Sequence, residues 1–476
     1  MLIKKIIKRI PSLLREGILL FFTGVIICSY CSCDTSKLTL IDLLQLGDGQ
    51  ILLAVNNQNK NHLIVYRDGI IETWGEPSFL DDLGQIKKLT KLTESMFAVI
   101  TEKNGIFLYP IKNITDTNPV IHLPVEEDAL ADKNIRAAYF YNYNNVRKLY
   151  VIYGTPKGSG ATEILFKNGW VIDHYATLDT TSSELRSNNL IQIEIDMKGN
   201  TWFNYSRKEE KGVSRLSPKG EWVHFDRNNS ELPDKFVRYL RSEGPDDGVA
   251  GDNMWFASVS GLSRLEYRPG QKDEEDREKW KLYGERETTG GIVARAMGIR
   301  ELVSDAVLDL IDLHVTDKLL LMANTTGVYT FNGRSINRFI PDSSGGLNET
   351  QIRDINYRDG YVIVKTRPLA KQNQYVDSVS LLNIKKRKWI KVKLWEFDKN
   401  YPRNIYFIPY KKGIDFVALD YINSATKFAF FDYETLELKK LEMTFPASED
   451  SEPPIDDKKR ENPQSEQSAP AEQGDQ

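Results

Sequence analysis

A four-strand pattern that recurs about every fifty residues constrains this chain more than any other feature. It is clearest in residues 190–225, where Ile191, Ile193 and Ile195 alternate with polar residues, as in a strand with one buried face. A Lys-Gly-Asn turn at 198–200 and three further short apolar segments, separated by turn residues, complete the pattern. Four antiparallel strands in so short a segment form a meander, which is the unit of a β-propeller blade.

The repeat can be followed through the chain by the central large apolar residue of its second strand. Eight such residues align, at Leu52, Phe97, Tyr150, Trp202, Trp255, Leu320, Ile363 and Phe416. Their spacings run from 43 to 65 residues, near the ~40–50 residues of four-stranded propeller repeats. The sequence therefore predicts an all-β fold, a β-propeller of eight four-stranded antiparallel blades over residues 37–445. Seven blades are the alternative, if a terminal unit merges with its neighbour.

Turn residues fall where this pattern needs them. Asp68-Gly69 and Asn168-Gly169 suit two-residue hairpins, in which both central residues take positive φ. In four repeats the third strand opens with a glycine and a branched apolar residue, at Gly105, Gly212, Gly261 and Gly327. The longest spacing contains a charged segment and the best helical candidate, Gly291–Val303. We interpret this region as an elongated outer hairpin followed by a loop with one or two helical turns.

The two ends differ in composition from the repeats. In residues 1–32, basic residues precede an apolar segment, Gly17–Cys28, that is shorter than the ~20 residues of a membrane-spanning helix. This pattern predicts a signal peptide. Residues 446–476 contain nine acids, three bases and no aromatic residue. Such a segment buries too little apolar surface to fold, so it is predicted to be a disordered acidic tail.

All three cysteines, Cys28, Cys31 and Cys33, lie at the end of the first segment. The stretch resembles a bacterial lipoprotein signal, in which cleavage occurs before a cysteine that becomes lipidated. Cys33 is the predicted lipid attachment site because the small Ser32 precedes it, whereas bulky residues precede the other two. The resemblance implies a membrane tether at 33–36. Asp34 would favour the inner membrane in some Gram-negative bacteria, but this rule does not hold in every phylum, so the choice between inner and outer membrane stays open. An uncleaved signal anchor and an ordinary cleaved signal are the alternatives.

No catalytic, metal or cofactor site is predicted. The five histidines fall in different repeats, and none has another His or Cys at ligand spacing: His62, His122, His174, His224 and His314. The sequence has no nucleophile elbow or phosphate-binding loop motif, and Gly154–Thr162 is interpreted as a plain loop. The acids Asp305, Asp309 and Asp312 are candidates for binding a cation or a sugar, although solvated acids are the simpler interpretation.

Four tryptophans take matching places in two neighbouring repeats. Trp202 corresponds to Trp255, and Trp222 corresponds roughly to Trp280. Packing between blades requires such regular placement, whereas a ligand platform does not. The pattern therefore favours a structural role for these side chains.

Two neighbouring repeats carry a motif that resembles two-component regulator propeller repeats. The segments are Gly199–Phe203 with Gly212–Leu216, and Asn253–Phe256 with Gly261–Leu265. Asp196 fits the acid that begins the motif. In that family the propeller is often the extracytoplasmic input region of a histidine kinase. No kinase-like segment is present here, so the resemblance implies a detached propeller module on a lipid tether.

These observations predict a class of function and an address. The net charge of −4 gives no basic footprint, so a nucleic-acid partner is not expected. The predicted protein is a non-enzymatic cell-envelope lipoprotein that faces the periplasm or the cell exterior. Its propeller would bind or scaffold a protein or glycan through rigid loops. A sensory input partner of a separate two-component kinase is one alternative, and a propeller enzyme such as a polysaccharide lyase is another.

Overall fold

The strands of the structure follow the alternation seen in the sequence. Every one of the 33 elements in the described part of the chain is a β-strand. The computed structural model describes residues 39–441 except 48, 58–59, 75–82, 113–118, 126–129, 155–158, 197, 207–210, 244–252, 259–260, 268–277, 288–292, 296–309, 311, 316–318, 325–326, 333–334, 341–349, 369–377, 393, 395–401 and 422–424. The chain divides into the units 1–442 and 443–476, and all described residues belong to the first.

The first four blades are antiparallel sheets of consecutive strands. Blade 1 holds β1 (Thr39–Gly47), β2 (Gln50–Asn57), β3 (Lys60–Arg67) and β4 (Ile70–Trp74). Blade 2 holds β5 (Ile86–Thr93), β6 (Met96–Thr101), β7 (Ile106–Pro110) and β8 (Ile121–Leu123). Blade 3 holds β9 (Ile135–Tyr143), β10 (Val146–Tyr153), β11 (Ala161–Lys167) and β12 (Val171–Leu178). Blade 4 holds β13 (Leu190–Ile195), β14 (Thr201–Tyr205), β15 (Val213–Leu216) and β16 (Trp222–Phe225).

The last four blades repeat this order, with one extra strand in blade 5. Blade 5 holds β17 (Tyr239–Ser242), β18 (Asn253–Ser258), β19 (Gly261–Tyr267), β20 (Glu278–Glu287) and β21 (Val293–Arg295). Blade 6 holds β22 (Asp312–Val315), β23 (Leu320–Asn324), β24 (Gly327–Phe331) and β25 (Ile336–Phe339). Blade 7 holds β26 (Thr350–Arg358), β27 (Tyr361–Pro368), β28 (Ser378–Asn383) and β29 (Lys388–Val392). Blade 8 holds β30 (Asn404–Lys411), β31 (Ile414–Asp420), β32 (Lys427–Asp432) and β33 (Glu437–Leu441).

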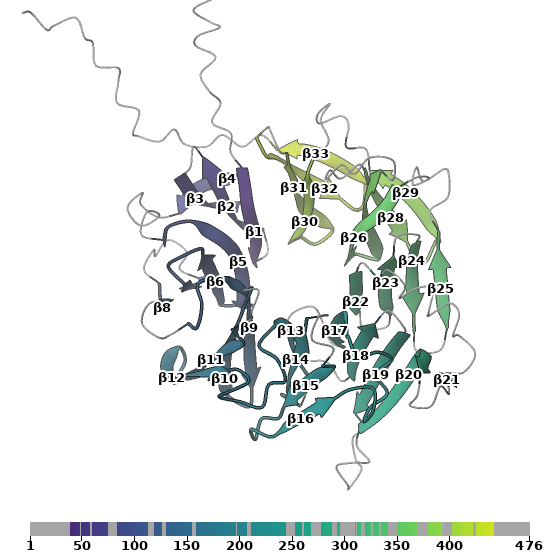
Figure 1. Ribbon diagram of the computed structural model, residues 1–476. Helices are drawn as coiled ribbons and strands as arrows, with labels where there is room; N and C mark the ends of the chain where they lie inside the picture. The colour runs from purple at the N-terminus through teal and green to yellow at the C-terminus, as the bar shows by residue number, and fades with distance from the viewer. Residues whose placement is uncertain are drawn as a thin grey trace, which may run out of the picture. The chain divides into compact units, whose positions relative to one another are not determined.

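The eight sheets confirm the predicted propeller and exclude the seven-bladed alternative. The first strand of each sheet lies toward the centre of the ring, and neighbouring first strands follow one another around it (Figure 1). Each of the eight aligned apolar residues lies in the second strand of its blade, with no more than 3% of its surface exposed. Clusters of buried side chains join each blade to the next, so the core is a series of inter-blade layers.

Blade 8 closes the ring against blade 1 without exchanging a strand, because each of the two sheets contains only its own consecutive strands. Tyr66 of β3 packs on three rings of blade 8, at centroid distances of 5.6 to 5.8 Å: Tyr410, Phe416 and Phe430. The backbone N–H of Leu40 donates to Thr426 Oγ1 at 3.0 Å. Side chains and isolated hydrogen bonds therefore hold this junction.

The predicted hairpin turns have the expected backbone. Asp68 and Gly69 have φ of 47° and 89°, and Asn168 and Gly169 have φ of 47° and 94°. The elongated outer hairpin is also confirmed, because β20 pairs with β21. Within the helical candidate Gly291–Val303, residues 293–295 form β21, and the rest lies outside the described residues.

Three third strands begin directly after a glycine at positive φ. Gly105, Gly160 and Gly212 have φ of 86°, 69° and 70°. A Cβ atom on any of them would lie far inside van der Waals distance of the carbonyl oxygen that ends the fourth strand of the same blade. Only glycine satisfies both constraints, because L-residues rarely adopt this conformation. In blades 2, 3 and 4, these glycines let the linker that follows the fourth strand pass close to the start of the third strand.

The predicted signal segment, with Cys33, and the predicted acidic tail lie outside the described residues. Among the residues that are described, no helix is long and apolar enough to cross a membrane.

Candidate functional site

The five histidines that the sequence singled out stay apart in the structure. They lie in five different blades, in β3, β8, β12, β16 and β22 respectively: His62, His122, His174, His224 and His314. Within the described part of the chain, no group of three or more His, Cys, Asp or Glu side chains is placed to hold a metal ion. Of the acidic candidates, Asp305 and Asp309 lie outside the described residues, and Asp312 begins β22. A cation or sugar site at these acids stays a prediction.

The matching tryptophans pack between blades, as their placement predicted. Trp202 is fully buried and lies 5.3 Å from both Phe225 of its own blade and Phe256 of blade 5, measured between ring centroids. Trp255 makes the corresponding contact with Phe331 of blade 6 at 5.8 Å.

Acids at the first turn of each of these blades hold the two indoles in place. Trp202 Nε1 donates to Asp196 Oδ2 at 2.8 Å, and Trp255 Nε1 donates to Glu243 Oε1 at 2.6 Å. The buried Asp196 carboxylate also accepts the hydroxyl of Tyr267 from blade 5. An acid at the first turn therefore ties its own blade to the next.

The linkers after blades 3 and 4 share a motif that sequence reasoning missed. Residues 179–185 read DTTSSEL, and residues 226–232 read DRNNSEL. In both, the serine four positions after the aspartate donates its hydroxyl to the aspartate carbonyl oxygen at 2.6 Å. Backbone N–H groups of the same linker bind each carboxylate, and with Thr181 they lower the pKa of Asp179 to about 2. We call the surface formed by residues 179–189 and 226–238 the linker face.

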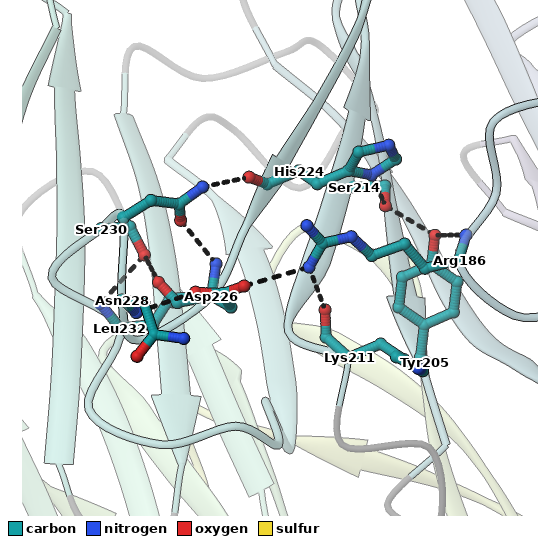
Figure 2. A network of polar contacts seen from close by, with 10 residues as sticks. Arg186, Tyr205, Lys211, Ser214, His224, Asp226, Asn228, Ser230 and Leu232 are labelled. Atoms are coloured by element: carbon teal, nitrogen blue, oxygen red, sulfur yellow. Dashed lines mark hydrogen bonds and ion pairs between the residues drawn. The ribbon is translucent and has the colours of Figure 1, made fainter. Parts of the chain in front are cut away.

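An ion pair connects the two linkers (Figure 2). Arg186 Nη1 lies 3.1 Å from Asp226 Oδ2 and 3.4 Å from the carbonyl oxygen of Lys211. Burial raises the pKa of Asp226, but the N–H of Asn228 and the Arg186 guanidinium outweigh it and hold this pKa below its ordinary value. Both side chains stay partly exposed, at 32% and 25%. An exposed pair of this kind contributes ~1 kcal/mol at most to stability, so its clearest consequence is the position of Arg186.

A chain of hydrogen bonds runs behind this ion pair (Figure 2). The backbone N–H of Arg186 donates to the Tyr205 hydroxyl at 3.2 Å, and that hydroxyl donates to Ser214 Oγ at 2.6 Å. Ser214 Oγ lies 2.7 Å from His224 Nδ1. Tyr205 and Ser214 are buried, whereas the His224 ring is half-buried. We call these four residues the relay.

The directions of these bonds favour one tautomer of His224. Because Tyr205 gives its proton to Ser214, the Ser214 proton is free to point at Nδ1, which then accepts it. This arrangement corresponds to a neutral His224 with its proton on Nε2. Burial and the charge of Arg186 lower the pKa of His224 and support this state, while Glu184 acts in the opposite direction.

Ser214 and His224 are a pair of residue types used in nucleophilic catalysis, but this arrangement does not serve it. Ser214 is fully buried, and Asp226 binds Arg186 rather than the imidazole. Blade 3 has the same hydroxyl contact between Tyr153 and Thr162, at 2.6 Å. There Thr177 pairs with the third strand where His224 does in blade 4. Blades 3 and 4 therefore share the hydroxyl pair, and of the two only blade 4 has the histidine.

Carboxylates near the centre of the ring cap strand edges. Asp42 of β1 accepts the N–H of Leu89 of β5 at 2.8 Å, and Glu194 of β13 accepts the N–H of Ser242 of β17 at 3.0 Å. Burial raises the pKa of both acids. The first strand of a blade has no partner strand on its inner side, and these side chains satisfy its N–H groups.

The buried acid Asp415 lies between blades 7 and 8. The residue before the aligned apolar position is apolar or threonine in seven repeats and is Asp415 in blade 8. Asp415 accepts the Tyr433 hydroxyl at 2.7 Å, and its Oδ1 lies 3.4 Å from Arg358 Nε of blade 7. Burial raises the pKa of Asp415 to about 6 despite these partners.

Asp415 should make stability fall as pH rises. The folded state keeps a proton up to a pH of about 6, whereas the unfolded chain loses it near pH ~4. The stabilising contribution is therefore present below pH ~4 and is lost by pH ~7, with a total of ~3 kcal/mol. In urea unfolding from pH 4 to 7.5, Asp415→Asn should lose this component, seen as a pH-dependent difference from wild type. A constant difference would contradict the assignment.

Comparisons with known proteins give no family and only distant likenesses to solved structures. Neither a model of a known protein family nor a curated protein matches the sequence. One similar solved structure is prolyl oligopeptidase B from Galerina marginata, with 12% identity and a TM-score of 0.44 over 86% of this chain and 51% of that one. The acylaminoacyl peptidase of Pyrococcus horikoshii has 9% identity and a TM-score of 0.39 over 85% and 52%.

A third solved structure is the extracellular domain of a protein from B. thetaiotaomicron described as a hybrid two-component system. It has 13% identity and a TM-score of 0.33, over 86% of this chain and 55% of that one. The present chain spans about half the length of each of these three solved chains. Like the two-component regulator propellers that the sequence motif resembles, the chain folds as a propeller.

One prediction is corrected by these comparisons. The sequence was interpreted as that of a non-enzymatic protein, but similar solved chains include an oligopeptidase and an acylaminoacyl peptidase. The exclusion of enzymatic activity was therefore wrong. It depended on missing catalytic motifs, and a missing motif says nothing of chemistry that a propeller supports without one.

Proposed function

We propose that this protein is an exported propeller that binds a protein or a glycan through the linker face of blades 3 to 5. The observation that carries the proposal is the ion pair between Arg186 and Asp226. It joins two linkers with the same internal capping and holds partly exposed charged groups in a fixed position. Preorganised polar groups on a rigid scaffold lose little entropy on binding.

The inter-blade packing supports this choice of surface. Trp202 and its buried neighbours fix blade 4 against blade 5 directly beside the second linker. The N–H of Gly212 donates to the carbonyl oxygen of Lys235 at 2.9 Å, which attaches the second linker to blade 4. The linker face therefore has the rigidity that a recognition surface needs.

Photo-crosslinking in intact cells followed by peptide mass spectrometry tests this proposal. Reactive groups placed at exposed linker positions, such as Thr180 and Asn228, should yield crosslinks to one protein or glycan species. Arg186→Glu should reduce that yield at least tenfold, because it places a carboxylate beside Asp226 and repels the linkers from each other. Arg387→Glu, in a turn of blade 7, is the matched charge change and should leave the yield unaltered. A crosslink yield that is the same in Arg186→Glu as in wild type would place the binding surface elsewhere.

Lipid attachment at Cys33 is the second part of the proposal. It is supported by the three clustered cysteines, the preceding apolar segment and the small Ser32. Cys33→Ala should move the protein from the membrane pellet to the soluble fraction of the envelope, because several acyl chains are needed for stable anchoring. Cys28→Ala and Cys31→Ala are matched controls and should leave it in the pellet. If either control released the protein and Cys33→Ala did not, the site would be reassigned.

A sensory role is the second candidate function. It is favoured by the motif segments in blades 4 and 5 that resemble two-component regulator propellers, because these are two of the three blades beside the linker face. Crosslinks from the linker face to the extracytoplasmic part of a membrane kinase would favour this candidate over a scaffold.

A further inference from the structure

We propose that His224 makes the linker face pH-sensitive. Protonation of its imidazole would break the hydrogen bonds that connect the Arg186 backbone to Tyr205, Ser214 and His224, and would loosen residues 179–189. The inference rests on the proposed function only in naming this surface as the one that binds, because the switch itself follows from the relay. Its basis is the direction of the hydrogen bonds among Arg186, Tyr205, Ser214 and His224 (Figure 2).

The relay has one arrangement in which every proton has an acceptor. The N–H of Arg186 cannot reverse, so the Tyr205 hydroxyl accepts it and donates to Ser214, and Ser214 donates to Nδ1 of His224. A proton added at Nδ1 turns that atom into a donor toward Ser214. The Ser214 hydroxyl hydrogen then has lost its acceptor in a fully buried position. A buried polar group without a partner is costly, so protonation favours separation of the relay.

The charges around His224 act in the same direction. Arg186 faces the ring from the first linker, and an imidazolium beside it would meet a like charge. Repulsion of Arg186 weakens its contact with Asp226, which lies two residues after His224 and belongs to the second linker. Glu184 opposes this effect as a counter-charge from the first linker. On its own strand, His224 stacks near the Trp222 ring at a centroid distance of 6.3 Å.

The half-buried ring connects solvent to the buried hydroxyls. Protons reach the exposed part of the imidazole, whereas Tyr205 and Ser214 are closed to water. Blade 3 keeps the hydroxyl pair and lacks the histidine, because Thr177 takes that place. The equivalent point of the repeat is therefore insensitive to pH, and the switch is confined to the junction of blades 3, 4 and 5.

Hydrogen exchange of the full-length protein at pH 7.5 and pH 5, corrected for intrinsic exchange rates, tests the switch. In wild type, the protection factors of the amides in residues 183–189 should fall by up to about tenfold for each pH unit below the midpoint at which His224 titrates. His224→Gln should show no such change, because glutamine does not titrate. His174→Gln, at an exposed histidine of blade 3, should behave as wild type.

Nitrogen-detected NMR of His224 provides an independent readout. At pH 7.5 Nδ1 should be unprotonated and Nε2 protonated, and in Ser214→Ala the pKa of His224 should rise. Equal pH dependence in wild type and His224→Gln, or a proton on Nδ1 at pH 7.5, would overturn the inference. Failure of Arg186→Glu to affect crosslinking would instead count against the binding surface and leave the exchange result standing.

Discussion

Trp202→Ala is expected to destabilise the protein by on the order of 3–5 kcal/mol, the range for removing a fully buried large aromatic side chain. The indole fills the layer between blades 4 and 5, and the Arg215 guanidinium lies 5.4 Å from its centroid. The substitution also removes the donor that Asp196 accepts at 2.8 Å, so a buried carboxylate loses one of its partners. Urea unfolding followed by circular dichroism measures the change.

Two further variants separate packing from hydrogen bonding at this position. Trp202→Phe keeps most of the ring volume and removes the N–H, so it should lie between wild type and Trp202→Ala. Trp389→Ala, in the outer strand β29, where the side chain is only partly buried, should cost much less. An unchanged unfolding midpoint in Trp202→Ala would contradict the packing role of the aligned residues.

Gly212→Ala is expected to cost roughly 2–5 kcal/mol, since a left-handed conformation and a steric clash combine at one residue. Gly212 has φ of 70°, and its Cβ would lie 3.0 Å from the carbonyl carbon of Phe225 and closer still to the oxygen. To admit the methyl group, β15 and the end of β16 must separate, and the bond from Gly212 to the Lys235 carbonyl oxygen is then strained. Thermal unfolding measures the loss.

The control is a glycine with similar dihedrals and free space. Gly220 has φ of 88°, and nothing lies within 4 Å of its Cβ position. Gly220→Ala therefore tests the backbone strain alone and should cost ~1 kcal/mol. Equal losses in the two variants would show that the clash at Gly212 is relieved at no cost.

The fold could be predicted because each blade repeats one strong constraint. The two faces of the second strand pack against the blades on either side, so its central residue must be large and apolar. Leu52 and Phe416 satisfy this requirement as well as Trp202 does. That constraint survives in all eight repeats even where the turns differ. The extra strand β21 was foreseen only as an elongated hairpin, since three residues of edge strand carry little pattern.

The candidate site was harder to predict, because its contacts join residues far apart in the chain. Asp196 was recognised as the start of a motif, yet its partner Tyr267 is 71 positions away in the next blade. Gly160 was assigned to a plain loop, although its place before a third strand matches that of Gly105 and Gly212. The DxxxSEL motif occurs in only two linkers, and comparing residues 179–185 with 226–232 would have revealed it.

The junction of blades 8 and 1 has a consequence for assembly. Each blade contains only consecutive residues, so blades can form one after another as the chain emerges from synthesis. The contact between Tyr66 and Phe416 then joins the ends of a curved stack and must come last. Until it forms, the first and final sheets each expose an unpaired flat side to solvent. The interval before closure is when this protein is most vulnerable to proteases and to domain-swapped pairing with another copy.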